Sequence, residues 1–203
     1  MTKNVQPMET GDLLFTLIGR GDNAISAVTA GYRGARVNHV GVAVRNPRGM
    51  FILEAFPPEV RLTNIAVHLR RSKDNEGRQR YMIGRLDVEH RHHIPEAITY
   101  GLVQRDIPYD RLYLTDEDAL YCSELVVDMF KSANDDTEFF EEHPMSFRDP
   151  ASGETHPHWV AYYEYFGMEV PHGEPGSNPG RISLDPKLDI YHVEGPIAGY
   201  QEP

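Results

Sequence analysis

The chain has 203 residues, of which 40% are hydrophobic and 25% charged, and its formal net charge is −11 at pH 7. This length predicts a single domain with a substantial core. The acidic balance argues against nucleic acid and anionic membrane surfaces as partners, because both attract clustered Lys and Arg.

Nothing in the sequence marks export or membrane insertion. No apolar run approaches the ~18 residues that a membrane-spanning helix requires. Residues 1–9 contain no apolar signal core. A single free cysteine fits a reducing compartment. We therefore expect a cytoplasmic protein without a membrane span.

The N-terminal part consists of short apolar runs separated by turn residues. The expected elements are a strand over residues 11–18, a helix over 23–30, and strands over 37–44 and 50–56. Asn46, Pro47, Arg48 and Gly49 suit a type I turn that joins the last two strands into a hairpin. Pro57-Pro58 then ends the second strand.

The remainder of the chain indicates further strands and helices. The expected elements are a loop or short helix over 62–69, an exposed charged run over 70–80, a strand over 81–86, helices over 94–103 and 121–131, a loop over 173–180, and a closing strand over 190–193. This order, without strict alternation, favours an α+β fold around a small antiparallel sheet. We expect one domain over 1–203, with its core over about 11–130 and a loop-rich extension over 135–203 packed on it.

Cys122 is the only cysteine, and it lies where the helix over 121–131 begins. It can form neither an internal disulfide nor a thiolate metal site with other cysteines. It is therefore either a small packing residue or a nucleophile. The start of a helix and a nearby imidazolium both lower the pKa of a thiol, which favours the second interpretation.

His39 and Glu54 are the candidate partners of Cys122. The predicted turn pairs Arg45 with Met50, which sets Gly41 opposite Glu54 and His39 diagonal to it. The two side chains then leave the same face of the sheet, with their Cβ atoms about 7 Å apart. In this hypothesis His39 acts as the base, Glu54 orients the imidazole, and backbone N–H groups near Cys122 stabilise an oxyanion. The alternative is that Cys122 and His39 are ordinary core residues.

Five segments occur in an order that resembles a known family: Gly11-Asp12-Leu13-Leu14-Phe15, Asn38-His39-Val40-Gly41-Val42, Leu53-Glu54-Ala55, Pro108-Tyr109-Asp110 and Tyr121-Cys122-Ser123-Glu124-Leu125-Val126. Together they resemble the YiiX/YaeF-like proteins, a circularly permuted branch of the NlpC-type papain-fold amidases. In unpermuted papain-like enzymes the cysteine precedes the histidine, whereas here His39 precedes Cys122.

The resemblance implies a permuted papain-like α+β domain, with a small antiparallel sheet packed on helices. It also implies a triad of Cys122, His39 and Glu54 that cleaves an amide, peptide or related acyl bond through a thioester. Family members are often envelope-associated. Because this sequence shows no export signal, we expect a small N-acyl or peptide-like substrate inside the cell.

Three further residues are candidate substrate-binding groups. Tyr109 and Asp110 match the Pro-Tyr-Asp segment of the family, and Tyr109 either donates its hydroxyl to the substrate or caps the core. Asp12 either lines the cleft or closes an Asx-type turn. No metal or other cofactor is expected, because His90-Arg91-His92-His93 lacks carboxylate or cysteine partners.

Two rival functions remain at this point. An acyltransferase would pass the same thioester to an acceptor other than water, as permuted relatives resembling lecithin-retinol acyltransferase do. A binding module would keep the scaffold without turnover. The sequence identifies neither the substrate nor the oligomeric state, nor whether the C-terminal region gates the cleft.

Overall fold

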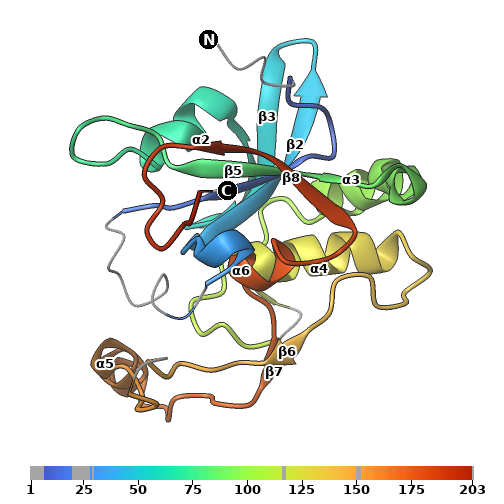
Figure 1. Ribbon diagram of the computed structural model, residues 1–203. Helices are drawn as coiled ribbons and strands as arrows, with labels where there is room; N and C mark the ends of the chain where they lie inside the picture. Colours follow the sequence, from blue (N-terminus) through green and yellow to red (C-terminus); the bar gives the residue numbers. More distant parts are fainter. Residues whose placement is uncertain (1–6, 20–27, 29, 116–117, 150–151, 203) are drawn as a thin grey trace.

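A computed structural model describes residues 7–19, 28, 30–115, 118–149 and 152–202. Its centre is a six-stranded sheet in which every neighbouring pair is antiparallel, with the order β4-β3-β2-β1-β5-β8 (Figure 1). The strands are β1 (Leu13–Thr16), β2 (His39–Asn46), β3 (Gly49–Phe56), β4 (Glu59–Asn64), β5 (Tyr81–Leu86) and β8 (Leu188–Glu194). The expected antiparallel α+β architecture is confirmed.

The β2–β3 hairpin has the predicted register. Arg45 pairs with Met50 and Val42 pairs with Leu53, around a turn at Pro47 and Arg48. The backbone of Gly41 passes so close to β3 that a Cβ atom there would lie 2.5 Å from Ile52 Cγ2 and 3.1 Å from Glu54 Cβ. Glycine at this position therefore lets the two strands approach closely.

Alternate residues of the sheet supply two separate cores. Leu13, Val42 and Leu53 face the larger core, which the helices α3 (Ile94–Val103) and α4 (Cys122–Ser132) cover. Ala43 and Ile52 face a smaller core, against which Ile65 and Leu69 of α2 (Ile65–Arg71) pack. Because both faces are buried, β1 and most of β2 read as continuous apolar runs rather than alternating ones.

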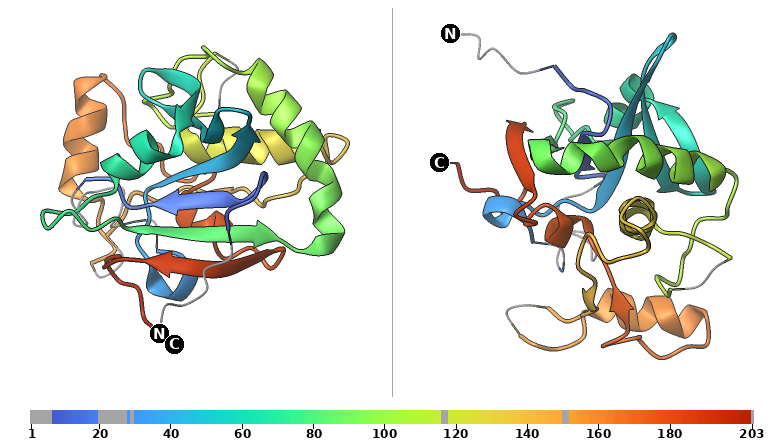
Figure 2. Two further views of the ribbon diagram at one scale, coloured as in Figure 1. Left: turned by 90° about the horizontal axis from the view of Figure 1, so that it is seen from above. Right: turned by 90° about the vertical axis from the view of Figure 1, so that its right-hand side faces the viewer.

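Residues beyond Asn134 lie on the opposite side of α4 from the sheet, and then return to it. Figure 2 shows α4 between the sheet layer and the segment that carries α5 (Pro157–Tyr165). A short ladder of β6 (His143–Pro144) and β7 (Pro175–Gly176) precedes α6 (Pro179–Ile182). Strand β8 then pairs with β5 and forms one edge of the main sheet.

Several elements differ from the sequence expectations. Strand β4 follows Pro57-Pro58 directly, and the expected loop or short helix is α2, which Asn64 caps by accepting a hydrogen bond from the Ala66 N–H. Helix α5 was not expected, and the expected loop over 173–180 contains β7 and the start of α6. Most of the helix expected over 23–30 lies outside the described residues.

The run over 70–80 is only partly exposed, contrary to expectation. Arg80 is 6% exposed, and it donates to the carbonyls of Gly19 and Ser72. The Arg71 side chain is 18% exposed and extends toward β3. Both guanidinium groups are held by acceptors that lie far from them in sequence or across a turn, and a local charge pattern does not reveal such partners.

Candidate active site

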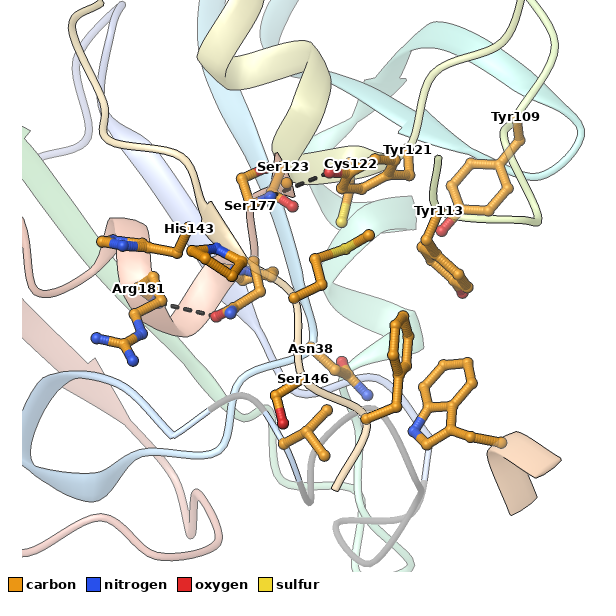
Figure 3. Close-up of a pocket in the computed structure, with 18 residues that line it drawn as sticks. Asn38, Tyr109, Tyr113, Tyr121, Cys122, Ser123, His143, Ser146, Ser177 and Arg181 are labelled. Carbon is orange, nitrogen blue, oxygen red and sulfur yellow. Dashed lines mark hydrogen bonds between the residues drawn. The ribbon is translucent and has the colours of Figure 1, made fainter. Parts of the chain in front are cut away.

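Cys122 is the first residue of α4 and is 5% exposed. Tyr121 precedes it as the N-cap, and the Tyr121 N–H donates to Glu124 Oε2 at 3.2 Å. This capping interaction directs the Glu124 carboxylate back to the turn before the cysteine. The Cys122 sulfur points into a cavity beside α4 (Figure 3).

His39 links Cys122 to Glu54. Its Nε2 lies 2.6 Å from Glu54 Oε2, and its side chain also shares a hydrogen bond with the Cys122 thiol. Because Nε2 is held by the carboxylate, Nδ1 is the ring nitrogen left for the sulfur. Burial by itself favours the neutral imidazole, but the hydrogen bonds with Cys122 and Glu54 outweigh it and raise the pKa of His39 to about 9.

Glu54 is fully buried and is contacted by three side chains. Oε2 also lies 2.9 Å from His68 Nδ1, and Oε1 lies 2.5 Å from Arg71 Nη2. Burial alone would raise the pKa of Glu54, but the hydrogen bonds from His39 and His68 hold it far below its usual range. The carboxylate is therefore ionised and fixed in one orientation.

His68 is contacted at both ring nitrogens. Its Nδ1 lies 2.9 Å from Glu54 Oε2 and donates to it in the tautomer whose Nε2, 3.5 Å from the Thr16 hydroxyl, is an acceptor. Burial lowers the pKa of His68, which keeps this imidazole neutral. The Arg71 guanidinium, 3.0 Å from Nδ1, supplies the positive charge that the Glu54 carboxylate requires.

Sequence reasoning missed His68 and Arg71. Both belong to α2, and they are three residues apart, on one helical face directed at Glu54. The available signal was the buried Glu54 itself, because an ionised carboxylate in an apolar strand requires more than one partner. Residues 62–69 alone do not show which strand the short helix covers.

The side chains of His39, Glu54 and His68 offer ligand atoms within 4.8 Å of one another, and this spacing would also suit a metal ion. The contacts of 2.6 and 2.9 Å between their nitrogen and oxygen atoms are hydrogen-bond lengths, however. The Arg71 cation also lies against Glu54 and His68, where an added cation would be repelled. As arranged here, the three residues do not fit a metal.

The cavity at Cys122 has a volume of about 140 Å³ and extends between α4 and the C-terminal segment. It is lined by Tyr109, Tyr113, Tyr121, Ser123, Met145, Phe147, Trp159, Ser177 and Arg181, among others. Tyr109 and Tyr113 lie together on one side of it, and His143 and Arg181 lie on the other (Figure 3). The Tyr121 hydroxyl accepts from the Ser177 N–H at 3.1 Å, which ties the C-terminal segment to the start of α4.

Tyr109, expected to contact substrate or cap the core, lines the cavity. Its hydroxyl is hydrogen-bonded to that of Tyr113. Burial, together with the nearby Tyr113 and Cys122, raises the pKa of Tyr109 well above its ordinary value. Tyr109 is therefore a neutral hydroxyl close to the thiol.

The other two candidate binding residues lie away from the cavity lining. Asp12 is 1% exposed, and its carboxylate accepts from Arg85 at 2.7 and 2.8 Å and from the Tyr191 hydroxyl at 2.9 Å. Asp110 accepts from the N–H groups of Leu112 and Leu114, and thereby shapes the turn that leads to Tyr113.

The chain was compared with known proteins. A family model described as "Permuted papain-like amidase enzyme, YaeF/YiiX, C92 family" matches residues 7–190. The structure is similar to a crystal structure of YiiX from Escherichia coli O157:H7, described as a metalloprotein. The TM-score is 0.71 and the sequence identity 21%, over 93% of this chain and 98% of that one.

Comparison with curated protein sequences gives no match. No helix in the described ranges is long and apolar enough to cross a membrane. The family match covers most of the length, including β1, the hairpin with His39 and Glu54, and the helix that starts at Cys122. The chain therefore belongs to the YaeF/YiiX family of permuted papain-like amidases, the C92 peptidases.

Proposed function

We propose that the protein is a cysteine hydrolase that cleaves an amide, peptide or related acyl bond through a thioester on Cys122. The observation that carries the proposal is the continuous buried chain from the Cys122 thiol through His39 to Glu54. A raised pKa of His39 favours the imidazolium, and an imidazolium beside a thiol favours the thiolate.

The proposed reaction has two stages. The Cys122 sulfur attacks the substrate carbonyl, and the C–S bond forms as the C–N bond breaks. His39 gives its proton to the departing amine. Water, deprotonated by His39, then attacks the thioester and releases the acid and the free thiol. Glu54 orients His39 throughout and stabilises its charged form.

Backbone and hydroxyl groups near Cys122 are suited to the oxyanion that forms in each stage. Cys122 is the first residue of α4, and the N–H groups in the first turn of a helix are available to stabilise negative charge that develops beside it. Tyr109 and Tyr113 line the same cavity with neutral hydroxyls, and either is suited to contact the substrate oxygen.

The E. coli protein with a similar structure is described as a metalloprotein. In this chain the metal-capable side chains are engaged with one another and with Arg71, so no step of the proposed mechanism uses a metal. What the relative binds is a property of that protein.

Alkylation of Cys122 by iodoacetamide tests the proposed pairing. At pH 6.5 we expect His39→Asn to slow alkylation about tenfold, because the thiolate loses its counter-ion. His92→Asn, which removes an exposed imidazole from the same chain, is the matched control and leaves the rate unchanged. Since Cys122 is the only cysteine, no other thiol contributes to the signal. Equal rates in the wild type and His39→Asn would exclude the pairing and favour a binding module.

Trapping the acyl group tests the chemistry itself. Incubation with p-nitrophenyl acetate should give an acetyl adduct on Cys122 in intact-mass spectra, and Cys122→Ser should give no thioester. Decay of the adduct to acetate indicates hydrolysis. Decay only when an amine acceptor is added, with formation of the acetamide, would instead assign acyl transfer.

A further inference from the structure

The cavity at Cys122 carries hydrogen-bonding groups that the triad does not use. Two buried side-chain polar atoms that line this cavity lack a hydrogen-bond partner within the described part of the chain. They are Ser123 Oγ and Trp159 Nε1, on residues that are 1% and 3% exposed. The Ser177 hydroxyl, by contrast, is hydrogen-bonded to that of Tyr121. Buried polar groups are rarely left unpaired in native proteins, so their concentration here points to a ligand that completes them.

The type of these groups restricts what they can bind. The Trp159 indole N–H is a donor only, so its partner must be an acceptor such as a carbonyl or carboxylate oxygen. The Ser123 hydroxyl can donate to the same kind of oxygen. The walls around them include Phe147 and Met145, which favour an apolar or aromatic body on the ligand.

The charged side chains that line the cavity also restrict which ligands it can bind. The chain contains 31 acidic residues and has a net charge of −11, yet among the residues that the structure describes no Asp or Glu lines this cavity. Apart from Cys122 and the tyrosines, the charged or chargeable side chains in the described lining are Arg181 and His143, and Figure 3 shows them together on one side. In an acidic protein, the described lining around the thiol thus carries the positive charge of Arg181 and no carboxylate.

We infer that the substrate is a carboxylate-bearing amide of the N-acyl amino acid class. The carboxylate pairs with Arg181 at the rim, and the amide carbonyl oxygen accepts from Trp159 Nε1 and Ser123 Oγ in the interior. The apolar acyl group lies against the aromatic wall. This inference rests on the proposed function for its reacting bond, but its binding component can be measured without any turnover.

The binding measurement uses Cys122→Ala protein and a matched set of three probes. N-benzoylglycine carries a carboxylate, N-benzoylglycinamide is neutral, and N-benzoylethylenediamine is cationic, whereas the benzamide part is common to all three. Trp159 is the only tryptophan, so its fluorescence reports directly on cavity occupancy. We expect the carboxylate to bind about tenfold more tightly than the amide, and the cation to bind more weakly than either.

Two variants in the Cys122→Ala background separate the contacts. Arg181→Met should remove the preference for N-benzoylglycine over N-benzoylglycinamide, and Ser123→Ala should weaken both probes about fivefold without changing that preference. Arg48→Met removes the same charge from the exposed hairpin turn and is the matched control, with no expected effect.

Each outcome is decisive for the inference. Equal binding of the three probes, a preference that survives Arg181→Met, or no saturable fluorescence change with N-benzoylglycine would overturn it. Selective carboxylate binding that depends on Arg181 supports it. If that binding is seen while the wild type neither forms a thioester nor releases benzoate, the hydrolase proposal fails and the binding site stands.

Discussion

The His39 imidazole is the residue whose protonation most directly connects the site to the stability of the protein. Its folded-state pKa, about 9, lies above the ordinary value of 6.5. The folded protein therefore holds this proton more tightly than the unfolded chain does. The resulting stabilisation is fully present below pH 6.5 and is lost as the pH rises through about 9.

We accordingly expect the free energy of unfolding of the wild type to fall between pH 6.5 and 9. His39→Asn should lack this part of the decrease, because it has no imidazole to titrate. Urea unfolding at a series of pH values, taken as the difference between the two proteins, isolates this component. The hydrogen bond with Cys122 is the largest contribution that raises the pKa of His39. Cys122→Ser should therefore move the alkaline end of the window to lower pH. Parallel stability curves for the wild type and His39→Asn would contradict the raised pKa.

Glu54 and His68 act in the opposite pH range. The pKa of Glu54 is held below its usual value, so its contribution is present above pH 4.5 and is lost as the pH falls. The lowered pKa of His68 has the same consequence, because the unfolded chain gains a proton there that the folded protein does not. The site therefore stabilises the folded protein most at intermediate pH. The contributions of Glu54 and His68 are lost at lower pH, and that of His39 is lost at higher pH.

The β2–β3 hairpin is the element that brings His39 to Glu54, and its close strand approach depends on Gly41. A methyl group at this position would lie 2.9 Å from the Leu53 carbonyl oxygen and 2.5 Å from Ile52 Cγ2. Backbone atoms cannot move aside as a flexible side chain does, so the strands must separate.

We expect Gly41→Ala to lower the free energy of unfolding by about 2 kcal/mol, as overpacking of a core does. Because the displaced atoms adjoin Glu54, the variant should also alkylate at Cys122 more slowly under conditions where it remains folded. Gly101→Ala is the matched control. Its added methyl would meet the flexible ends of Leu53 and Met129, away from the site, and its helical position favours alanine. If the folded Gly41→Ala protein is alkylated at Cys122 at the wild-type rate, the close approach of the two strands is not needed for the reactivity of the thiol.

At the scale of the whole molecule, the residues after Asn134 complete both the core and the cavity. Strand β8 covers the edge of β5, and the side chains of Phe139, Phe140, Ile182 and Ile190 belong to the larger core. The same region supplies Trp159 and Ser177 to the cavity. This region therefore contributes both to the hydrophobic core and to the lining of the cavity at Cys122.

A chain that ends at Asn134 should consequently fail to unfold cooperatively and should expose an unpaired strand edge at β5. Circular dichroism during thermal unfolding, with limited proteolysis, tests this expectation. A chain that ends at Gln201 keeps all the core residues named above and serves as the control. A sharp transition in the shorter chain would show that residues 1–134 form an independent folding unit.

The parts of the site that depend on local sequence patterns could be predicted from the sequence. These parts are the hairpin that carries His39 and Glu54 and the helix that begins at Cys122. The two-residue turn at Pro47 and Arg48, which the sequence predicts, fixes the register of the hairpin, and with it the shared face of His39 and Glu54. The apolar spacing after Cys122 gave α4 to within one residue at each end. Strand β4, by contrast, follows a proline pair that ordinarily ends a strand, and only pairing with β3 reveals it.

The sequence by itself thus determined the antiparallel hairpin, the helix that presents Cys122 and the permuted order of His39 and Cys122. Only the tertiary structure decided that α2 places His68 and Arg71 against Glu54, that Asp12 pairs with Arg85, and that the C-terminal segment forms a wall of the cavity. The physical reason is the range of the interactions. Turn geometry and helical periodicity act over a few residues, whereas a buried carboxylate or an unpaired indole N–H is satisfied by groups that folding brings from anywhere in the chain.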